Sequence, residues 1–177
     1  MIGTDEIDLV RDSLEMARRA GAEKVRATLC RSEEDLVATL NGEVDRVTHC
    51  EDSSLNFALF ADGRFGSFST NKLDKSSLQD FLDSSVRTVR AISPDSCRDL
   101  PDPERCCTTA HTGDELELTD CQRERLDPQD RIRMALDASV YRDGILSEEG
   151  EYSDSIYETI LMDSNGVFCR HRETSFD

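Results

Sequence analysis

Cysteine and histidine side chains are the residues of this sequence best suited to bind a metal ion. Four of them lie between residues 106 and 121, namely Cys106, Cys107, His111 and Cys121. Thiolates and imidazoles are the ligands that zinc prefers. Zinc sites usually present their cysteines as CxxC pairs, however, and the sequence contains no such pair. We interpret the four as reduced thiols and a histidine in a loop, and keep a zinc site as the alternative.

The other two histidines each stand two residues before a glutamate, as His49-Cys50-Glu51 and His171-Arg172-Glu173. Hydrolytic zinc sites instead place two histidines one helical turn apart, with a glutamate beside the first. Both triplets lie in predicted strands, where successive side chains face opposite sides. We expect half-exposed strand residues here, with metal ligation as the weaker alternative.

Motifs for nucleophilic catalysis and for phosphate binding are also missing. The sequence has no G-x-S-x-G elbow, and its cysteines lack a recognisable histidine-bearing signature. The segment from Gly63 to Gly66 fits a hairpin turn better than a phosphate-binding loop. The sequence therefore predicts no catalytic residue, no cofactor-binding residue and no metal ligand in this chain.

The composition predicts a thin core and a charged surface. Of 177 residues, 37% are hydrophobic and 33% are charged, and 38 acidic against 21 basic residues give a net charge of -17. This charge repels nucleic-acid phosphates and anionic lipid, so we expect neither nucleic acid nor membrane as a partner. Because the acidic residues are spread along the chain, we interpret the charge as favouring solubility; a DNA mimic acting on a nucleic-acid enzyme is the alternative.

The start of the sequence and its cysteines favour a cytoplasmic protein. Residues Met1 to Glu6 are acidic rather than signal-like, and no apolar run approaches the roughly 18 residues of a transmembrane helix. Seven cysteines are an odd number without secretory context, which predicts reduced thiols.

Residues 1–92 are predicted to form an α+β domain. An apolar stripe predicts a first amphipathic helix from Thr4 to Gly21, and a second runs from Asp74 to Ile92. Between them, alternating segments and two hairpin dipeptides indicate an antiparallel β-meander of about five strands. The dipeptides are Asn41-Gly42 and Asp62-Gly63, and Ser32–Asp35 is predicted as a further, acidic turn. We expect the two helices to cover one face of this meander.

Residues 93–127 are predicted to be a long linker, with one short strand at Glu115–Leu118. Residues 128–177 then start with a helix at Pro128 and continue into antiparallel strands. We expect these strands to begin a second, incomplete sheet, with Val167–Thr174 as an unpaired edge. On this interpretation the second sheet continues in a longer polypeptide or is completed by a partner chain.

Five segments, in this order, resemble the amino-terminal region of the TldD/PmbA family of metalloproteases. They are Ala20-Gly21-Ala22, Asn41-Gly42-Glu43-Val44, the run from Gly66 to Asp74, Ser93-Pro94-Asp95-Ser96-Cys97, and the stretch from Tyr152 to Gly166. The likeness spans nearly the whole chain, and Ser93–Cys97 is more similar to the PmbA branch.

The resemblance implies a non-catalytic, amino-terminal part of a peptidase that acts on unfolded peptides in the cytoplasm. In the TldD branch a HExxxH helix and a later cysteine bind zinc, and none of these ligands has a counterpart here. Zinc is thus expected only in a downstream region or a partner subunit, and the chain alone is expected to be inactive. The implied partner is a TldD-like or PmbA-like subunit, with which the chain forms a homo- or heterodimer and lines the substrate cleft.

The alternative is a stand-alone binding or regulatory module that adds a partner strand to Val167–Thr174.

Overall fold

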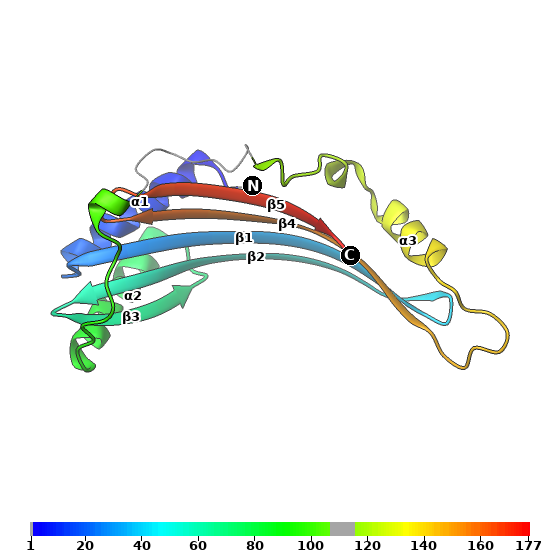
Figure 1. Cartoon of the computed structure of the whole chain (residues 1–177), viewed down its shortest axis with the longest axis horizontal. Helices are drawn as coiled ribbons and strands as arrows, with labels where there is room; N and C mark the ends of the chain where they lie inside the picture. The colour runs from blue at the N-terminus through cyan, green and yellow to red at the C-terminus, as the bar shows by residue number, and fades with distance from the viewer. Residues whose placement is uncertain (1, 107–115) are drawn as a thin grey trace. The chain divides into compact units, whose positions relative to one another are not determined.

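The computed structural model describes residues 2–106 and 116–177, and it confirms an α+β fold. Figure 1 shows the helices and strands in their order along the chain. The elements are α1 Thr4–Arg19, β1 Lys24–Leu40, β2 Glu43–Ala61, β3 Arg64–Thr70, α2 Lys75–Ala91, α3 Pro128–Asp137, β4 Glu149–Asp163 and β5 Phe168–Phe176, with short 3-10 turns η1 Pro103–Arg105 and η3 Arg123–Arg125. None of the helices in the described ranges combines the length and apolar character needed to cross a membrane.

The described strands form one sheet, in the order β3-β2-β1-β4-β5. The separate second sheet expected in residues 128–177 is therefore wrong, because β4 and β5 extend the sheet that β1 to β3 begin. Main-chain hydrogen bonds hold β4 beside the start and the end of β1, from Ser164 to Val25 (2.8 Å) and from Asn41 to Glu148 (2.9 Å). The physical reason is that the hairpin with β2 uses only one edge of β1, and the unpaired groups of its other edge are satisfied by β4.

The predicted acidic turn at Ser32–Asp35 is also wrong, since β1 continues through it without a break. Local composition favours a turn, but Glu33 and Asp35 form ion pairs with arginines that lie far away in sequence. These pairs satisfy the carboxylates within an extended strand. The hairpins at Asn41-Gly42 and Asp62-Gly63 are confirmed, and all four residues adopt the positive φ of a tight turn.

The chain divides into two compact contact units that each draw on both halves of the sequence. Unit 1 comprises Met1–Arg31, Ser53–Gly113 and Glu158–His171, and unit 2 comprises Ser32–Asp52, Asp114–Tyr157 and Arg172–Asp177. The limits of these units differ from the domain boundaries predicted at residues 92 and 127. The predicted boundaries describe parts that fold independently, and they stay a prediction.

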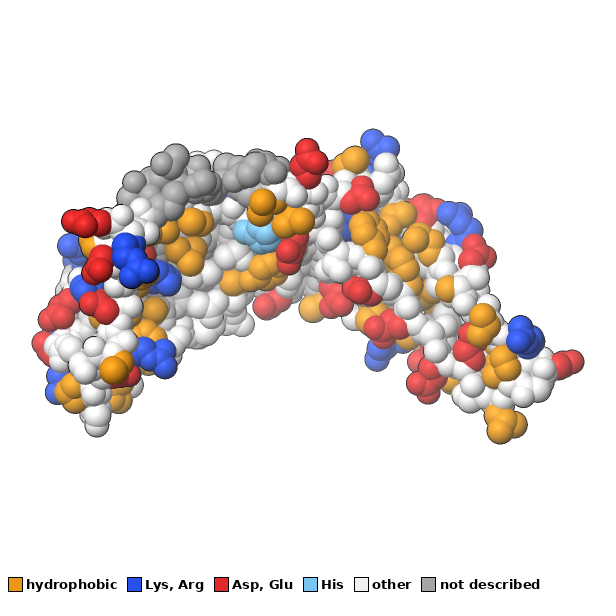
Figure 2. Space-filling model, viewed as in Figure 1, with side chains coloured by type: hydrophobic (Ala, Val, Ile, Leu, Met, Phe, Trp, Pro, Cys, Tyr) orange, Lys and Arg blue, Asp and Glu red, His pale blue; other side chains and the backbone are white. Residues whose placement is uncertain are grey.

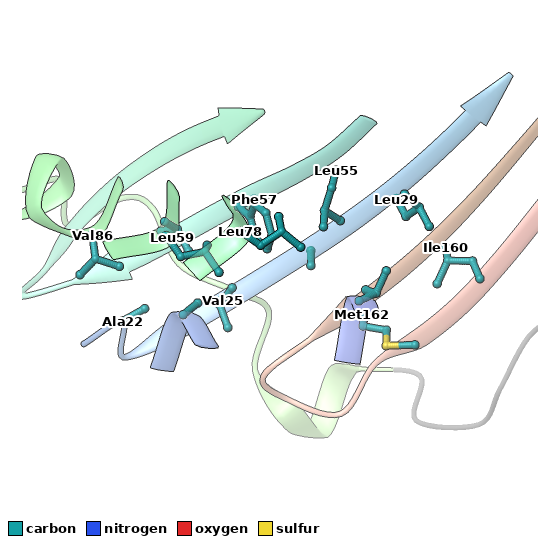
Figure 3. Packing of buried hydrophobic residues seen from close by; sticks show 14 of the residues in the cluster. Ala22, Val25, Leu29, Leu55, Phe57, Leu59, Leu78, Val86, Ile160 and Met162 are labelled. Carbon is teal, nitrogen blue, oxygen red and sulfur yellow. The ribbon is translucent and has the colours of Figure 1, made fainter. Parts of the chain in front are cut away.

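Unit 1 contains the main hydrophobic core. Helices α1 and α2 contact each other, and α2 packs against β3. Figure 3 shows buried side chains of β1, β2, β4 and α2 meeting in this core, among them Val25, Phe57, Leu78 and Ile160. Gly66 of β3 permits the close packing, because a Cβ there would lie 2.9 Å from a methyl carbon of Val89 in α2. The two helices predicted to cover the meander are thus confirmed. The meander itself has three strands, β1 to β3, and the prediction of about five is wrong because β1 and β2 run through positions where turns were expected.

Unit 2 has a much smaller core, made by Val37, Ala135, Tyr152 and the partly buried Ile132. Helix α3 begins at Pro128, as predicted, with Asp127 as its N-cap. The Asp127 side chain accepts a hydrogen bond from the main chain of Asp130 (2.8 Å). Leu116 to Leu118, the described part of the predicted short strand, is not a strand.

Candidate interaction surface

Two of the four cysteine and histidine residues of the predicted zinc alternative, Cys106 and Cys121, lie in the described structure. Cys107 and His111 lie outside the described residues. Cys106 lies beside η1, where its thiol donates to the carbonyl oxygens of Pro101 and Asp102, and Cys121 is exposed. Within residues 2–106 and 116–177, no three His, Cys, Asp or Glu side chains are arranged to hold a metal ion. The zinc alternative for the four residues stays a prediction.

His49 lies on β2 with its side chain about half exposed, at 52%. Its Nδ1 is 2.8 Å from a carboxylate oxygen of Asp35, and its Nε2 is 3.4 Å from one of Glu51. Hydrogen bonding to Asp35 in the first place, and to Glu51 in the second, raises the pKa of His49 above 6.5. The other strand histidine, His171, lies on β5 and is partly buried.

A buried cluster of charged side chains occupies the interior of unit 2, and sequence reasoning missed it. Asp154 on β4 is fully buried and accepts two hydrogen bonds from Arg131 of α3, from Nε (2.6 Å) and from the terminal nitrogen (3.0 Å). This is the strong bidentate geometry of an arginine–carboxylate pair. Arg123 of η3 lies 2.9 Å from the same carboxylate, and the Tyr152 hydroxyl donates to it (3.1 Å). Burial, followed by the charge of Asp154, raises the pKa of Tyr152 to about 12.

Two carboxylates of β1 complete the cluster. Asp35 lies 3.0 Å from Arg131, and Glu33 lies 3.1 Å from Arg123. Each buried guanidinium therefore faces carboxylates from both β1 and β4. Because every charge has a partner, the cluster fits a positioning role better than acid–base chemistry: it fixes α3 and η3 to the sheet of unit 2. A signal was present in the sequence, since the alternation of β4 puts Asp154 on the same face as Tyr152.

Two of the hollows on unit 2 are formed partly by β2. The first, of about 330 Å³, has mainly apolar walls formed by β1, β2 and α3, and its lining residues are Asp35, Leu36, Val37, Val47, Thr48, His49, Pro128 and Arg131. The second, of about 370 Å³, lies near the β1–β2 hairpin and includes Leu40, Asp45, Arg46 and Glu151 in its wall. Both hollows border β2.

The part of β2 that belongs to unit 2 is an edge strand. β2 pairs with β3 only from Leu55, opposite Thr70, to Ala61, opposite Arg64. Residues Glu43 to Asp52 are all exposed, and no strand of the described chain pairs with their outer edge. The edge predicted at Val167–Thr174 is partly covered instead, because the main-chain nitrogen of Thr174 donates to the carbonyl oxygen of Leu118 (3.0 Å).

Exposed large apolar side chains gather on unit 2. Among the described residues, Ile92 is the only one of them in unit 1. The others are Leu40, Val44, Val47, Leu116, Leu118, Met134, Val140, Tyr141, Leu146 and Phe176. On the face seen in Figure 2, orange apolar side chains lie among interspersed red and blue ones, so this face carries no continuous acidic surface of the kind a DNA mimic requires. Unit 2 therefore combines a small core with most of the exposed large apolar side chains of the described chain.

Comparisons with known proteins give structural matches. No family model matches the sequence, and no curated protein matches it. A proposed modulator of DNA gyrase from Bacteroides thetaiotaomicron superposes with a TM-score of 0.89 at 26% identity, over 99% of this chain. A second proposed gyrase modulator, from Thermotoga maritima, gives a TM-score of 0.69 at 14% identity over 96% of this chain, and TldE from Thermococcus kodakarensis gives 0.66 at 14% over 95%.

The chain has a TldD/PmbA-like fold. This confirms the resemblance that the five ordered segments indicate. The chain spans 37 to 40% of the length of these three structures.

Proposed function

We propose that this chain is a non-catalytic, binding region of a TldD/PmbA-type metallopeptidase that processes peptides inside the cell. In this role it contributes to a dimer with a TldD-like or PmbA-like subunit and lines the cleft for unfolded peptide substrates. Zinc and the catalytic residues belong to a downstream region or to the partner subunit.

The observation that carries the proposal is the gathering of exposed apolar side chains on unit 2. Val140 and Leu146 are 62% and 99% exposed, for example, whereas the buried cluster of unit 2 holds three residues. Removing apolar surface from water stabilises a protein or complex by about 25 cal/mol per Å². A partner that covers these exposed side chains therefore stabilises the complex by burying apolar surface that folding of unit 2 leaves in water. The TldD/PmbA-like fold supports a related subunit as that partner.

Size-exclusion chromatography of the chain mixed with a zinc-bearing TldD-type subunit tests the proposal. We expect co-elution, and a loss of co-elution for the variant Val140→Asn combined with Leu146→Asn. Ile92→Asn is the control, because Ile92 is the exposed large apolar residue of unit 1 among the described residues, at 42%. Separate elution of the unmodified chain from both TldD-type and PmbA-type subunits would contradict the proposal.

A stand-alone module that acts by strand addition remains the second candidate. The open edge of β2 favours it, whereas the edge at Val167–Thr174 is already bonded to Leu118 at one end. For this candidate, binding to a peptide strand does not depend on a peptidase subunit.

A further inference from the structure

We propose that the edge of β2 from Glu43 to Asp52 binds an extended, basic segment of polypeptide as an added strand. This segment of β2 is called the open edge below. The inference rests on the proposed function only in treating the chain as a binding region, and it names the chemistry of the partner.

The first argument is the supply of unpaired backbone groups. Along β2, the residues from Leu55 to Ala61 have β3 on their outer side, but β3 ends at Thr70, opposite Leu55. The open edge therefore presents a row of main-chain N–H and C=O groups that no described strand satisfies. An incoming extended peptide satisfies such groups in strand addition, while its alternate side chains contact the two faces of the sheet.

The second argument is charge, and it selects the partner. The open edge carries four carboxylates, on Glu43, Asp45, Glu51 and Asp52, against one arginine, Arg46. Its side chains are exposed throughout. Lysine or arginine side chains on an incoming strand would lie opposite these carboxylates, and opposite charges across a strand pair stabilise it.

The same charge argues against a second copy of this chain as the occupant. Two copies that pair antiparallel through the open edge bring the acidic ends Glu43 and Asp52 next to each other. Each copy also carries a net charge of -17, so that the two chains repel each other as they approach. Charges on an exposed edge are a common protection against such self-pairing.

The third argument is the 330 Å³ hollow beside the open edge. Val47 and His49 of the open edge share its wall with Leu36 and Val37 of β1. This apolar wall suits the methylene stem of a lysine or arginine. The Glu51 side chain is 59% exposed, and its carboxylate lies 3.4 Å from His49, which lines the hollow. Glu51 can therefore pair with the charged end of a lysine or arginine whose stem lies against this wall.

Binding of a ten-residue peptide of alternating lysine and valine to the full chain tests the inference. We expect saturable binding, with new hydrogen-exchange protection confined to the amides from Glu43 to Asp52. The same peptide with glutamate in place of lysine should not bind. Combining Glu43→Gln, Asp45→Asn and Glu51→Gln should weaken the affinity by about tenfold or more. Each exposed charge pair strengthens binding by up to about fivefold in the dissociation constant.

The matched control combines Glu15→Gln, Glu23→Gln and Asp80→Asn, which removes the same charge from exposed residues of unit 1. We expect this variant to keep its affinity within about twofold, because none of the three residues lies on β2, where the added strand would pair. Equal weakening by both triple variants, binding of the glutamate peptide, or protection that maps to β5 would each overturn the inference. Loss of binding to a TldD-type subunit with retained peptide binding would instead refute the proposed function alone.

Discussion

Asp154 is the residue on which the interior of unit 2 depends most. Its carboxylate is fully buried and faces Arg131, Arg123 and the Tyr152 hydroxyl. Removing a buried carboxylate that faces two guanidinium groups lowers the free energy of unfolding by more than the net stabilisation that the ion pairs supply. The reason is that the removal leaves buried positive charge without compensation.

We therefore expect Asp154→Ala to lower the free energy of unfolding of unit 2 by about 3 to 5 kcal/mol. All three tyrosines lie in unit 2 and the chain has no tryptophan, so urea unfolding followed by tyrosine fluorescence reports on this unit. Glu151→Ala is the control, because Glu151 pairs with Arg46 on the surface of unit 2 and such pairs contribute about 0 to 1 kcal/mol. Equal effects of the two substitutions would contradict a special role for Asp154.

His49 links the open edge to the same cluster through Asp35. Its pKa is raised in the folded chain, chiefly by hydrogen bonding to Asp35, so the folded state binds the proton more tightly than the unfolded state does. The stabilisation is therefore fully present below the ordinary value of 6.5 and is lost as the pH rises through the folded pKa.

A histidine titration followed by NMR should give a pKa for His49 above 6.5. Asp35→Asn should lower this pKa more than Glu51→Gln does, because the contact with Asp35 is shorter, at 2.8 Å against 3.4 Å. The reverse order of the two variants would show that Glu51 is the main partner.

At the scale of elements, α3 is a helix that needs help to form. It has 10 residues, and isolated helices shorter than about 12 to 15 residues are marginal in water. Its stability comes from the ion pairs of Arg131, from Ala135 in the small core, and from the N-cap Asp127.

Asp127→Ala should cost about 1 kcal/mol in the free energy of unfolding, because the main-chain N–H of Asp130 loses its acceptor. Asp127→Ser keeps a capping oxygen and should retain most of the stability. Tyrosine fluorescence during urea unfolding measures both variants. If the serine variant were as unstable as the alanine variant, capping would not be the cause.

At the scale of the whole molecule, the two units differ in the amount of apolar surface that they bury. The buried cluster of unit 1 includes side chains from both of its helices and from three strands, whereas that of unit 2 holds Val37, Ala135 and Tyr152. Since apolar burial supplies most of the stabilising free energy, unit 2 is expected to open more readily.

Native-state hydrogen exchange should therefore show slower exchange at Val25 to Leu29 of β1 than at Leu36 to Thr39 of the same strand. Comparing the two ends of one strand controls for the intrinsic properties of a β-sheet. Binding of a partner to unit 2 should reduce the difference, because the partner covers its exposed apolar side chains. Uniform protection along β1 in the free chain would contradict this assignment of stability.

Local sequence signals were sufficient for the α+β class, for the two tight hairpins and for the helices α1 and α2. Positive-φ dipeptides placed both hairpins, and stripes of apolar residues placed α1 and α2, because these signals depend on neighbours in the chain. The ordered segments also indicated the TldD/PmbA-like fold, which the structural matches confirm.

Only the tertiary structure decided how the strands join and where charge is buried. The union of β4 with β1 in one sheet, the continuation of β1 through Glu33 and Asp35, and the meeting of Asp154 with Arg123 and Arg131 all depend on residues far apart in sequence. The open edge is a consequence of the same kind, since it exists because β3 ends opposite Leu55. A carboxylate that reads as a turn or a solvated surface group from its neighbours becomes an interior residue when distant arginines compensate its charge.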